Sequence, residues 1–238
     1  MKTKWVRSAT AALFCLATLQ GCASSPDIQP LEDPEAQLRE GLQEWQALRA
    51  DGNSCASGGR RYPYVDCGRI QAKIERLVLD FPNHPSILLA NAVISSQTGR
   101  PDKAIAYLDE LIDAGNATPD AIVLRSQLAI QTGNLPFARR LLGTHTRLVP
   151  DHPGLREAMA SVHYLDGSFA AARRDLAIAQ RLGAPSWRIA YHRGLIEETT
   201  GNEAAAMREY GEALRERPDW AEPRSRLRGL ESRQIATP

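Results

Sequence analysis

The side chains best suited to chemistry in this chain are its five histidines and four cysteines. The histidines are His84, His145, His152, His163 and His192, and none stands in an HExxH, beside a GxSxG nucleophile or at a cysteine-histidine spacing. Ser161 and His163 are two apart in an expected helix and therefore face different ways. We expect His145 to be packed and His163 and His192 to be ordinary imidazoles. The sequence predicts no enzyme, no cofactor and no metal site.

Residues 1–22 have the pattern of an export signal. Three basic residues precede an apolar run over 11–19, which is too short to remain in a bilayer as a spanning helix. The run ends in Leu-Gln-Gly-Cys, which resembles a bacterial lipobox with its cysteine at Cys22. That resemblance implies a diacylglyceryl group on Cys22, removal of residues 1–21 and a further acyl chain on the freed amine, which together make a stable anchor. An ordinary signal peptide with an incidental cysteine is the alternative.

The residues after Cys22 indicate where the chain is held. Ala23 follows the cysteine, and under the sorting rule of enterobacterial lipoproteins it implies release to the outer membrane. We therefore expect a lipid anchor on the periplasmic face of the outer membrane of a Gram-negative bacterium. Residues 22–34 contain three prolines and no apolar periodicity, which predicts a disordered tether. Cleavage would remove three of the 29 basic residues and none of the 28 acidic ones, and the resulting charge of −2 gives no support for nucleic-acid binding.

Two cysteines, Cys55 and Cys67, remain after cleavage and lipidation. Both lie in a segment over 51–68 that is rich in glycine and has no core of its own, in a compartment that oxidises thiols. We predict a disulfide between them, which contributes about 3 kcal/mol in the chain-entropy account. A metal pair is the weaker alternative, because two thiolates do not complete a tetrahedral site.

A repeat of 34 residues organises the rest of the chain. Glycines recur at this period, each followed five residues later by alanine: Gly99, Gly133, Gly167 and Gly201, then Ala104, Ala138, Ala172 and Ala206. Such a period is typical of a helix-turn-helix solenoid, in which each unit must stack on its neighbours to bury its apolar face. The glycines predict the turns that end the first helix of each unit.

Recurring apolar columns predict the core of this solenoid. Each first helix carries two apolar columns with a small residue between them, and each second helix carries a leucine or tyrosine. The columns are Ile87, Ala121, Leu155 and Ile189; Ile94, Leu128, Val162 and Ile196; the small Ala92, Ser126, Ala160 and Gly194; and Leu108, Leu142, Leu176 and Tyr210.

The pattern over residues 85–220 resembles the tetratricopeptide repeat. It places a small residue eighth, glycine fifteenth, alanine twentieth, leucine or an aromatic twenty-fourth and proline thirty-second. The resemblance implies an all-α solenoid of four such units. We expect residues 35–84 to form an earlier unit, with a first helix over 35–50 and a second from Ile70, and residues 221–238 to form a polar-faced cap.

In solenoids of this kind the first helices line the concave side, which here predicts a groove for a protein or peptide. Its expected residues, at the second, fifth, ninth and twelfth places, include Leu89, Val93, Val123, Gln127, Ile130, Ser161, Tyr164, Tyr191 and Glu198, with Glu157 and Arg188 at equivalent places. We expect the apolar members to adjoin one another in successive units. The alternative is that they pack between neighbouring helices or under the N-terminal insertion.

A second stripe recurs on the convex side, at Arg140, Arg174 and Arg208, with Arg139 and Arg173 beside it. We expect a solvated face paired with Asp175, Glu209 and Glu212, the alternative being a contact with anionic lipid or glycan.

Together these features predict an envelope adaptor that holds a periplasmic or outer-membrane protein. Similarity to pilotin-like repeat lipoproteins or to repeat lipoproteins that gather cell-wall hydrolases would place it in pilus and secretin assembly or in wall-enzyme recruitment. A structural subunit of an envelope complex, or a self-associating homodimer without a free groove, is the competing interpretation.

Overall fold

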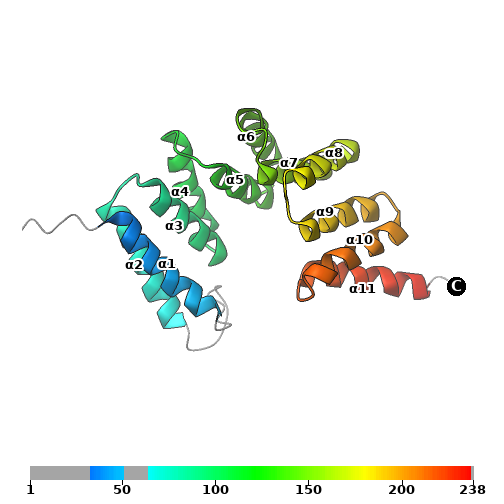
Figure 1. The fold of residues 1–238 in the computed structure, drawn as a ribbon, viewed down its shortest axis with the longest axis horizontal. Coiled ribbons are helices and arrows are strands. Elements are labelled where there is room, and N and C mark those ends of the chain that lie inside the picture. Colours follow the sequence, from blue (N-terminus) through cyan, green and yellow to red (C-terminus); the bar gives the residue numbers. More distant parts are fainter. Residues whose placement is uncertain (1–32, 51–63, 237–238) are drawn as a thin grey trace, which may run out of the picture. The chain divides into compact units, whose positions relative to one another are not determined.

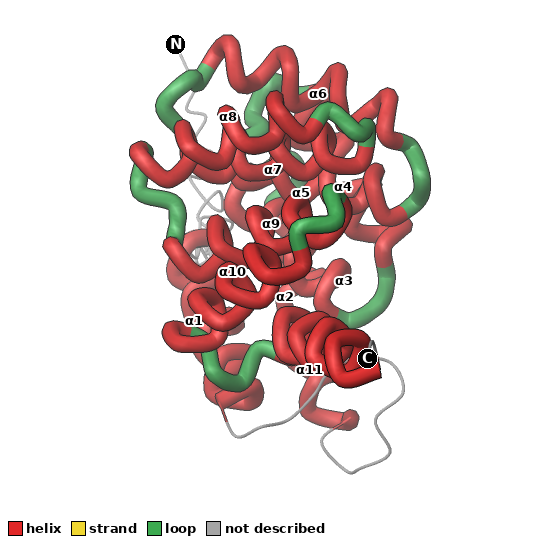
Figure 2. Tube along the Cα trace, turned by 90° about the vertical axis from the view of Figure 1, so that its right-hand side faces the viewer, coloured by secondary structure: helices red, strands yellow, loops and turns green. Residues whose placement is uncertain are grey.

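The computed structural model describes residues 33–50 and 64–236, and every regular element in these ranges is an α-helix (Figures 1 and 2). Within residues 64–236, short loops join each helix to the next. The helices are α1 (Pro34–Ala50), α2 (Tyr64–Asp80), α3 (Pro85–Gln97), α4 (Pro101–Asp113), α5 (Pro119–Gln131), α6 (Leu135–Leu148), α7 (Pro153–Leu165), α8 (Phe169–Arg181), α9 (Ser186–Thr199), α10 (Glu203–Glu216) and α11 (Ala221–Ala236). All belong to one compact unit that begins at Pro34. None of these described helices combines the length and apolar character needed to cross a bilayer. The predicted export signal, Cys22 and Cys55 lie outside the described residues.

The turns of the 34-residue repeat have the predicted backbone. Gly133 follows α5 with a φ of 78°, and the glycines at the equivalent places take the same left-handed conformation. A side chain is strained in that conformation, which explains why the repeat keeps glycine there. The next helix begins within two residues, and Asn134 caps α6 by accepting a hydrogen bond from the amide of Phe137 at 3.2 Å.

The predicted core columns are buried. Consecutive helices pack in pairs from α1 with α2 to α9 with α10, and first helices also contact one another, α1 with α3, α5 with α7 and α7 with α9. The alanines at the helix crossings and the leucines and tyrosine one turn after them on the same helices have no exposed surface: Ala104, Ala138, Ala172, Ala206, Leu108, Leu142, Leu176 and Tyr210. Burial of these columns supplies the main favourable term for stacking the units.

The predicted cap is also present. Helix α11 packs on α10 and buries Leu230, while Leu227 is partly buried beside it. Most of its other described side chains face solvent. A single helix with one apolar stripe therefore covers the last unit, as terminal repeats require.

The start of α2 differs from the sequence-based prediction. The helix begins at Tyr64 rather than near Ile70, so residues 64–68 belong to α2 and not to an insertion without a core. Helix α1 begins at Pro34, within one residue of the predicted start. Cys67 is buried and packs in one cluster with Leu38, Trp45 and Ile70. Together with Ile74 it continues the stripe of α2 at the helical spacing i, i+3, i+7. The Cys67 side chain is therefore part of the core of this pair of helices, which the interpretation of 51–68 as a segment without a core had missed.

Candidate functional site

A cavity of about 680 Å³ lies between α5, α7, α9 and the turn that follows α10. Its lining includes seven of the residues expected at groove places: Val123, Gln127, Ile130, Glu157, Ser161, Arg188 and Tyr191. The three from α5 are spaced i, i+4 and i+7, so they share one face of that helix. Val123 and Ile130 also pack at the edge of the core beneath, which fixes the apolar wall of the cavity.

Aromatic side chains form the opposite wall. The rings of Trp187 and Trp220 meet edge to face with centroids 4.9 Å apart, and Tyr191 lies 4.6 Å from Trp220. The guanidinium of Arg217 stacks over Trp187 at 4.7 Å. Ring contacts of this kind are worth about 0.5–1.5 kcal/mol each beyond their buried area, so this wall is held in place before any ligand arrives.

A buried acid lies between these walls. Glu157 on α7 is only 3% exposed and accepts a hydrogen bond from Arg188 Nε at 2.7 Å. His192 Nε2 lies 3.2 Å from the same carboxylate oxygen. Both partners belong to α9, so the carboxylate ties α7 to α9 across the unit boundary. A charge this deeply buried requires such partners.

Ser161 and His163 point in different directions, as their spacing predicts. Ser161 Oγ donates to the backbone carbonyl of Glu157 at 3.3 Å, whereas His163 lies 3.5 Å from Asp175 on α8. His145 is half-buried, and burial lowers its pKa. Among the described residues, no three histidine, cysteine, aspartate or glutamate side chains are grouped so that they could hold a metal ion.

Leu89 and Val93 do not join this cavity, contrary to the expectation of one continuous apolar groove. They line a separate hollow of about 750 Å³ between α1 and α3, with Leu42 and Trp45 on its other side. The difference arises because α3 packs against α1, whose apolar stripe faces these two residues. Apolar first-helix positions are therefore divided between two sites.

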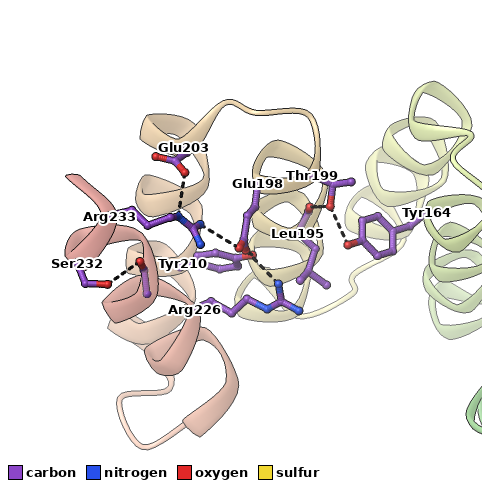
Figure 3. Close-up of polar contacts among 10 residues, drawn as sticks. Tyr164, Leu195, Glu198, Thr199, Glu203, Tyr210, Arg226, Ser232 and Arg233 are labelled. Carbon is purple, nitrogen blue, oxygen red and sulfur yellow. Dashed lines mark hydrogen bonds and ion pairs between the residues drawn. The ribbon is translucent and has the colours of Figure 1, made fainter. Parts of the chain in front are cut away.

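Tyr164 and Glu198 line neither hollow. The Tyr164 hydroxyl lies 2.9 Å from that of Thr199 on α9 (Figure 3). Glu198 accepts hydrogen bonds from the Tyr210 hydroxyl at 2.6 Å and from Arg226 at 3.2 Å, and it lies 3.5 Å from Arg233 (Figure 3). The predicted groove carboxylate thus holds the cap α11 against α9 and α10.

The environment of Glu198 sets its charge. Burial raises the pKa of this carboxyl, but the hydroxyl of Tyr210 and the guanidinium of Arg226 outweigh burial and hold the pKa below its usual value. Burial and the hydrogen bond to Glu198 raise the pKa of Tyr210, which keeps the phenol protonated as a donor. The contact that docks α11 is therefore a charge-assisted hydrogen bond.

The sequence prediction missed Trp187, Trp220 and His192 as cavity residues. A signal for the two tryptophans was present in the repeat register. Trp187 stands where the earlier units begin with proline, and Trp220 stands where two of them have the helix caps Thr118 and His152. Bulky aromatic residues stand at these two repeat places only in the last unit, and their rings contact each other in the wall of the cavity.

This arrangement defines a class of protein, an α-solenoid of stacked helix-turn-helix units. The family model of the tetratricopeptide repeat matches residues 157–222. Those residues are tetratricopeptide repeats, and the helical unit as a whole has the tetratricopeptide-type fold, which confirms the predicted all-α solenoid. A fold of this type is typical of scaffolds for protein interactions.

Solved structures agree on the fold. The tetratricopeptide protein TTC0263 of Thermus thermophilus aligns with a TM-score of 0.64 at 18% identity, over 83% of this chain and 98% of its own. A tetratricopeptide repeat protein of Parabacteroides merdae aligns with a TM-score of 0.60 at 16% identity, over 83% of this chain and 79% of its own. A chain of the APC/C hetero-tetramer Cut9-Hcn1 gives 0.69 at 14% identity, and the match covers 88% of this chain but 38% of that one. No curated protein matches the sequence significantly.

Proposed function

We propose that this protein is a lipid-anchored interaction scaffold of the bacterial envelope, which holds a segment of a partner protein in the cavity between α5, α7 and α9. The tetratricopeptide-type fold supports a protein partner in general. The observation that carries the choice of site is the cavity itself, which combines an apolar wall at Val123 and Ile130 with an aromatic wall at Trp187 and Trp220.

The lining indicates the chemistry of the partner segment. Apolar and aromatic walls favour an apolar or aromatic side chain of the partner, which would be desolvated on both sides. Gln127 is exposed on α5 and can donate and accept hydrogen bonds, as the backbone of an extended peptide requires. Glu157 already accepts from Arg188, so it serves to position the wall of α9 rather than to bind a cation of the partner.

A pair of valine variants tests the site. Val123→Glu places a charge in the proposed cavity, whereas the matched Val93→Glu places the same charge in the hollow beside α1. We expect affinity capture from crosslinked, detergent-solubilised envelopes to recover one stoichiometric partner with the wild-type and Val93→Glu proteins and to lose it with Val123→Glu. Far-UV circular dichroism of each variant verifies that the helices remain folded.

Two results would contradict the proposed site. Equal capture by both variants would remove the cavity as the binding surface. Recovery of the protein alone, with a dimeric mass by light scattering, would favour the self-associating structural subunit instead.

The envelope location is proposed from the lipobox-like sequence at Cys22. Cys22→Ala should abolish metabolic labelling with a palmitate analogue and move the protein from the membrane to the soluble fraction, because the acyl chains would be absent. Continued sedimentation of the variant with outer membranes would contradict the anchor. The resemblance to pilotin-like and hydrolase-gathering lipoproteins suggests pilus or wall-enzyme assembly as the pathway, and the identity of the captured partner distinguishes the two.

A further inference from the structure

A second hollow, of about 620 Å³, lies between α6, α7 and α8 and shares no lining residue with the proposed partner cavity. Its lining is dominated by basic side chains. Four arginines and one histidine contribute to it: Arg139, Arg140, Arg147, Arg156 and His163. The remaining lining includes a single carboxylate, that of Asp175.

The register of two helices brings these groups together. On α6, Arg140, Thr144 and Arg147 follow one another at i, i+4 and i+7, so they form one row on the helix. On α7, Arg156 and His163 are seven residues apart, two turns along the same face. The row on α6 therefore faces a row on α7 across the hollow.

Two of the arginines already have partners. Arg139 forms an ion pair with Asp166. Arg156 lies 3.4 Å from Asp175, which also lies 3.5 Å from His163 Nε2. Asp175 thus forms its ion pairs with α7, while Arg174 of the convex stripe acts on it as a further positive charge that lowers its pKa. Burial raises the pKa of Asp175, although His163 and Arg156 act against that rise.

The other two arginines are not compensated. Within the described part of the chain, no carboxylate lies within ion-pairing distance of Arg140 or Arg147, and both side chains are exposed. The hydroxyl of Thr144 stands between them on the helix and is exposed as well. The Nδ1 atom of His163 is buried at the hollow without a hydrogen-bond partner. The hollow therefore has an excess of positive charge and unused donors.

We propose that this hollow binds a phosphate group through the guanidinium groups of Arg140 and Arg147, with the Thr144 hydroxyl as a further donor. Guanidinium forks donate pairs of parallel hydrogen bonds, which match the oxygens of a phosphate and fix its orientation. A phosphomonoester offers three such oxygens and nearly two negative charges, enough to engage two forks at once. The group could belong to an anionic lipid headgroup or to free phosphate, and the experiment separates these sources.

The test uses isothermal titration calorimetry of the full chain in a zwitterionic detergent. The probes are inorganic phosphate, short-chain phosphatidic acid as a lipid phosphomonoester, short-chain phosphatidylglycerol as a phosphodiester, and acetate. We expect saturable binding of a phosphomonoester by the wild-type protein. The affinity should fall about tenfold in Arg140→Gln and about tenfold in Arg147→Gln, and a tenfold change corresponds to about 1.4 kcal/mol. Arg208→Gln is the matched control, because it removes an exposed arginine at the same repeat place as Arg140 but on α10.

The outcomes assign or reject the site. Equal affinity for inorganic phosphate and phosphatidic acid identifies free phosphate as the source, and tighter binding of phosphatidic acid identifies a lipid headgroup. Absence of saturable phosphate binding would overturn the proposal, as would equal weakening by Arg208→Gln or stronger binding of acetate. Partner capture through the Val123 cavity should be unaffected by Arg140→Gln, so this inference and the proposed function can fail separately.

Discussion

Gly194 offers a sharp test of how the last unit is packed. A Cβ atom added at this position would lie 2.5 Å from Cε1 and 2.6 Å from Cδ1 of Tyr210. Tyr210 is fully buried, and its hydroxyl is held by Glu198 at 2.6 Å, so the ring has little room to move. We therefore expect Gly194→Ala to destabilise the protein.

The magnitude follows from two opposing effects. Inserting a methyl group into a packed core costs about 1–3 kcal/mol, and the immobile ring places this case near the upper end. Alanine is better than glycine in a helix interior by about 1 kcal/mol, which offsets part of that cost. The net expectation is a loss of about 2 kcal/mol in the free energy of unfolding.

The chain itself supplies the compensating change. The other units combine a slightly larger small residue with leucine at the equivalent places: Ala92 with Leu108, Ser126 with Leu142 and Ala160 with Leu176. In a Tyr210→Leu background, Gly194→Ala should therefore stabilise by about 0.5–1 kcal/mol, because the clash is gone and helix propensity remains.

Urea unfolding of the four proteins, followed by tryptophan fluorescence, measures this cycle, since Trp187 and Trp220 lie in the same part of the fold. A neutral effect of Gly194→Ala in the wild-type background would refute the reasoning. The same loss in both backgrounds would show that the ring of Tyr210 is not what the methyl group meets.

Three further predictions concern the contacts between units. Glu157→Ala should lower the free energy of unfolding by roughly 2–3 kcal/mol in urea titrations, because Arg188 loses its charge-assisted hydrogen bond, while Glu157→Gln should cost less. Acidification should release α11, which hydrogen exchange would detect, because the pKa of Glu198 is lower in the folded protein than in the unfolded chain. The stabilisation from Glu198 is therefore complete above its unfolded-state pKa of about 4.3 and is lost as the pH falls through its folded-state pKa. Reduction should loosen α1 and α2 in limited proteolysis and spare the later repeats, because breaking the predicted disulfide of Cys67 would disturb the core in which this cysteine packs; uniform sensitivity would contradict the predicted disulfide.

Periodicity carried most of the fold prediction. The 34-residue spacing located the turns at Gly99 and Gly133, and the recurring columns located the buried residues, because both depend on backbone conformation within one unit. The start of α2 was missed because Cys67 was assigned to a loop by its neighbours rather than by its spacing from Ile70.

The tertiary structure decided what the surfaces are. Register alone placed Val93, Val123 and Glu198 on equivalent faces, but the packing of α3 on α1 and the docking of α11 gave each a different environment. Contacts such as Glu157 with His192 span 35 residues and join neighbouring units. They depend on how one unit lies on the next and on which long side chain reaches across. The sequence by itself therefore determined the repeat, its core and its cap, because these are set within single units, and only the three-dimensional arrangement determined which exposed residues form a site.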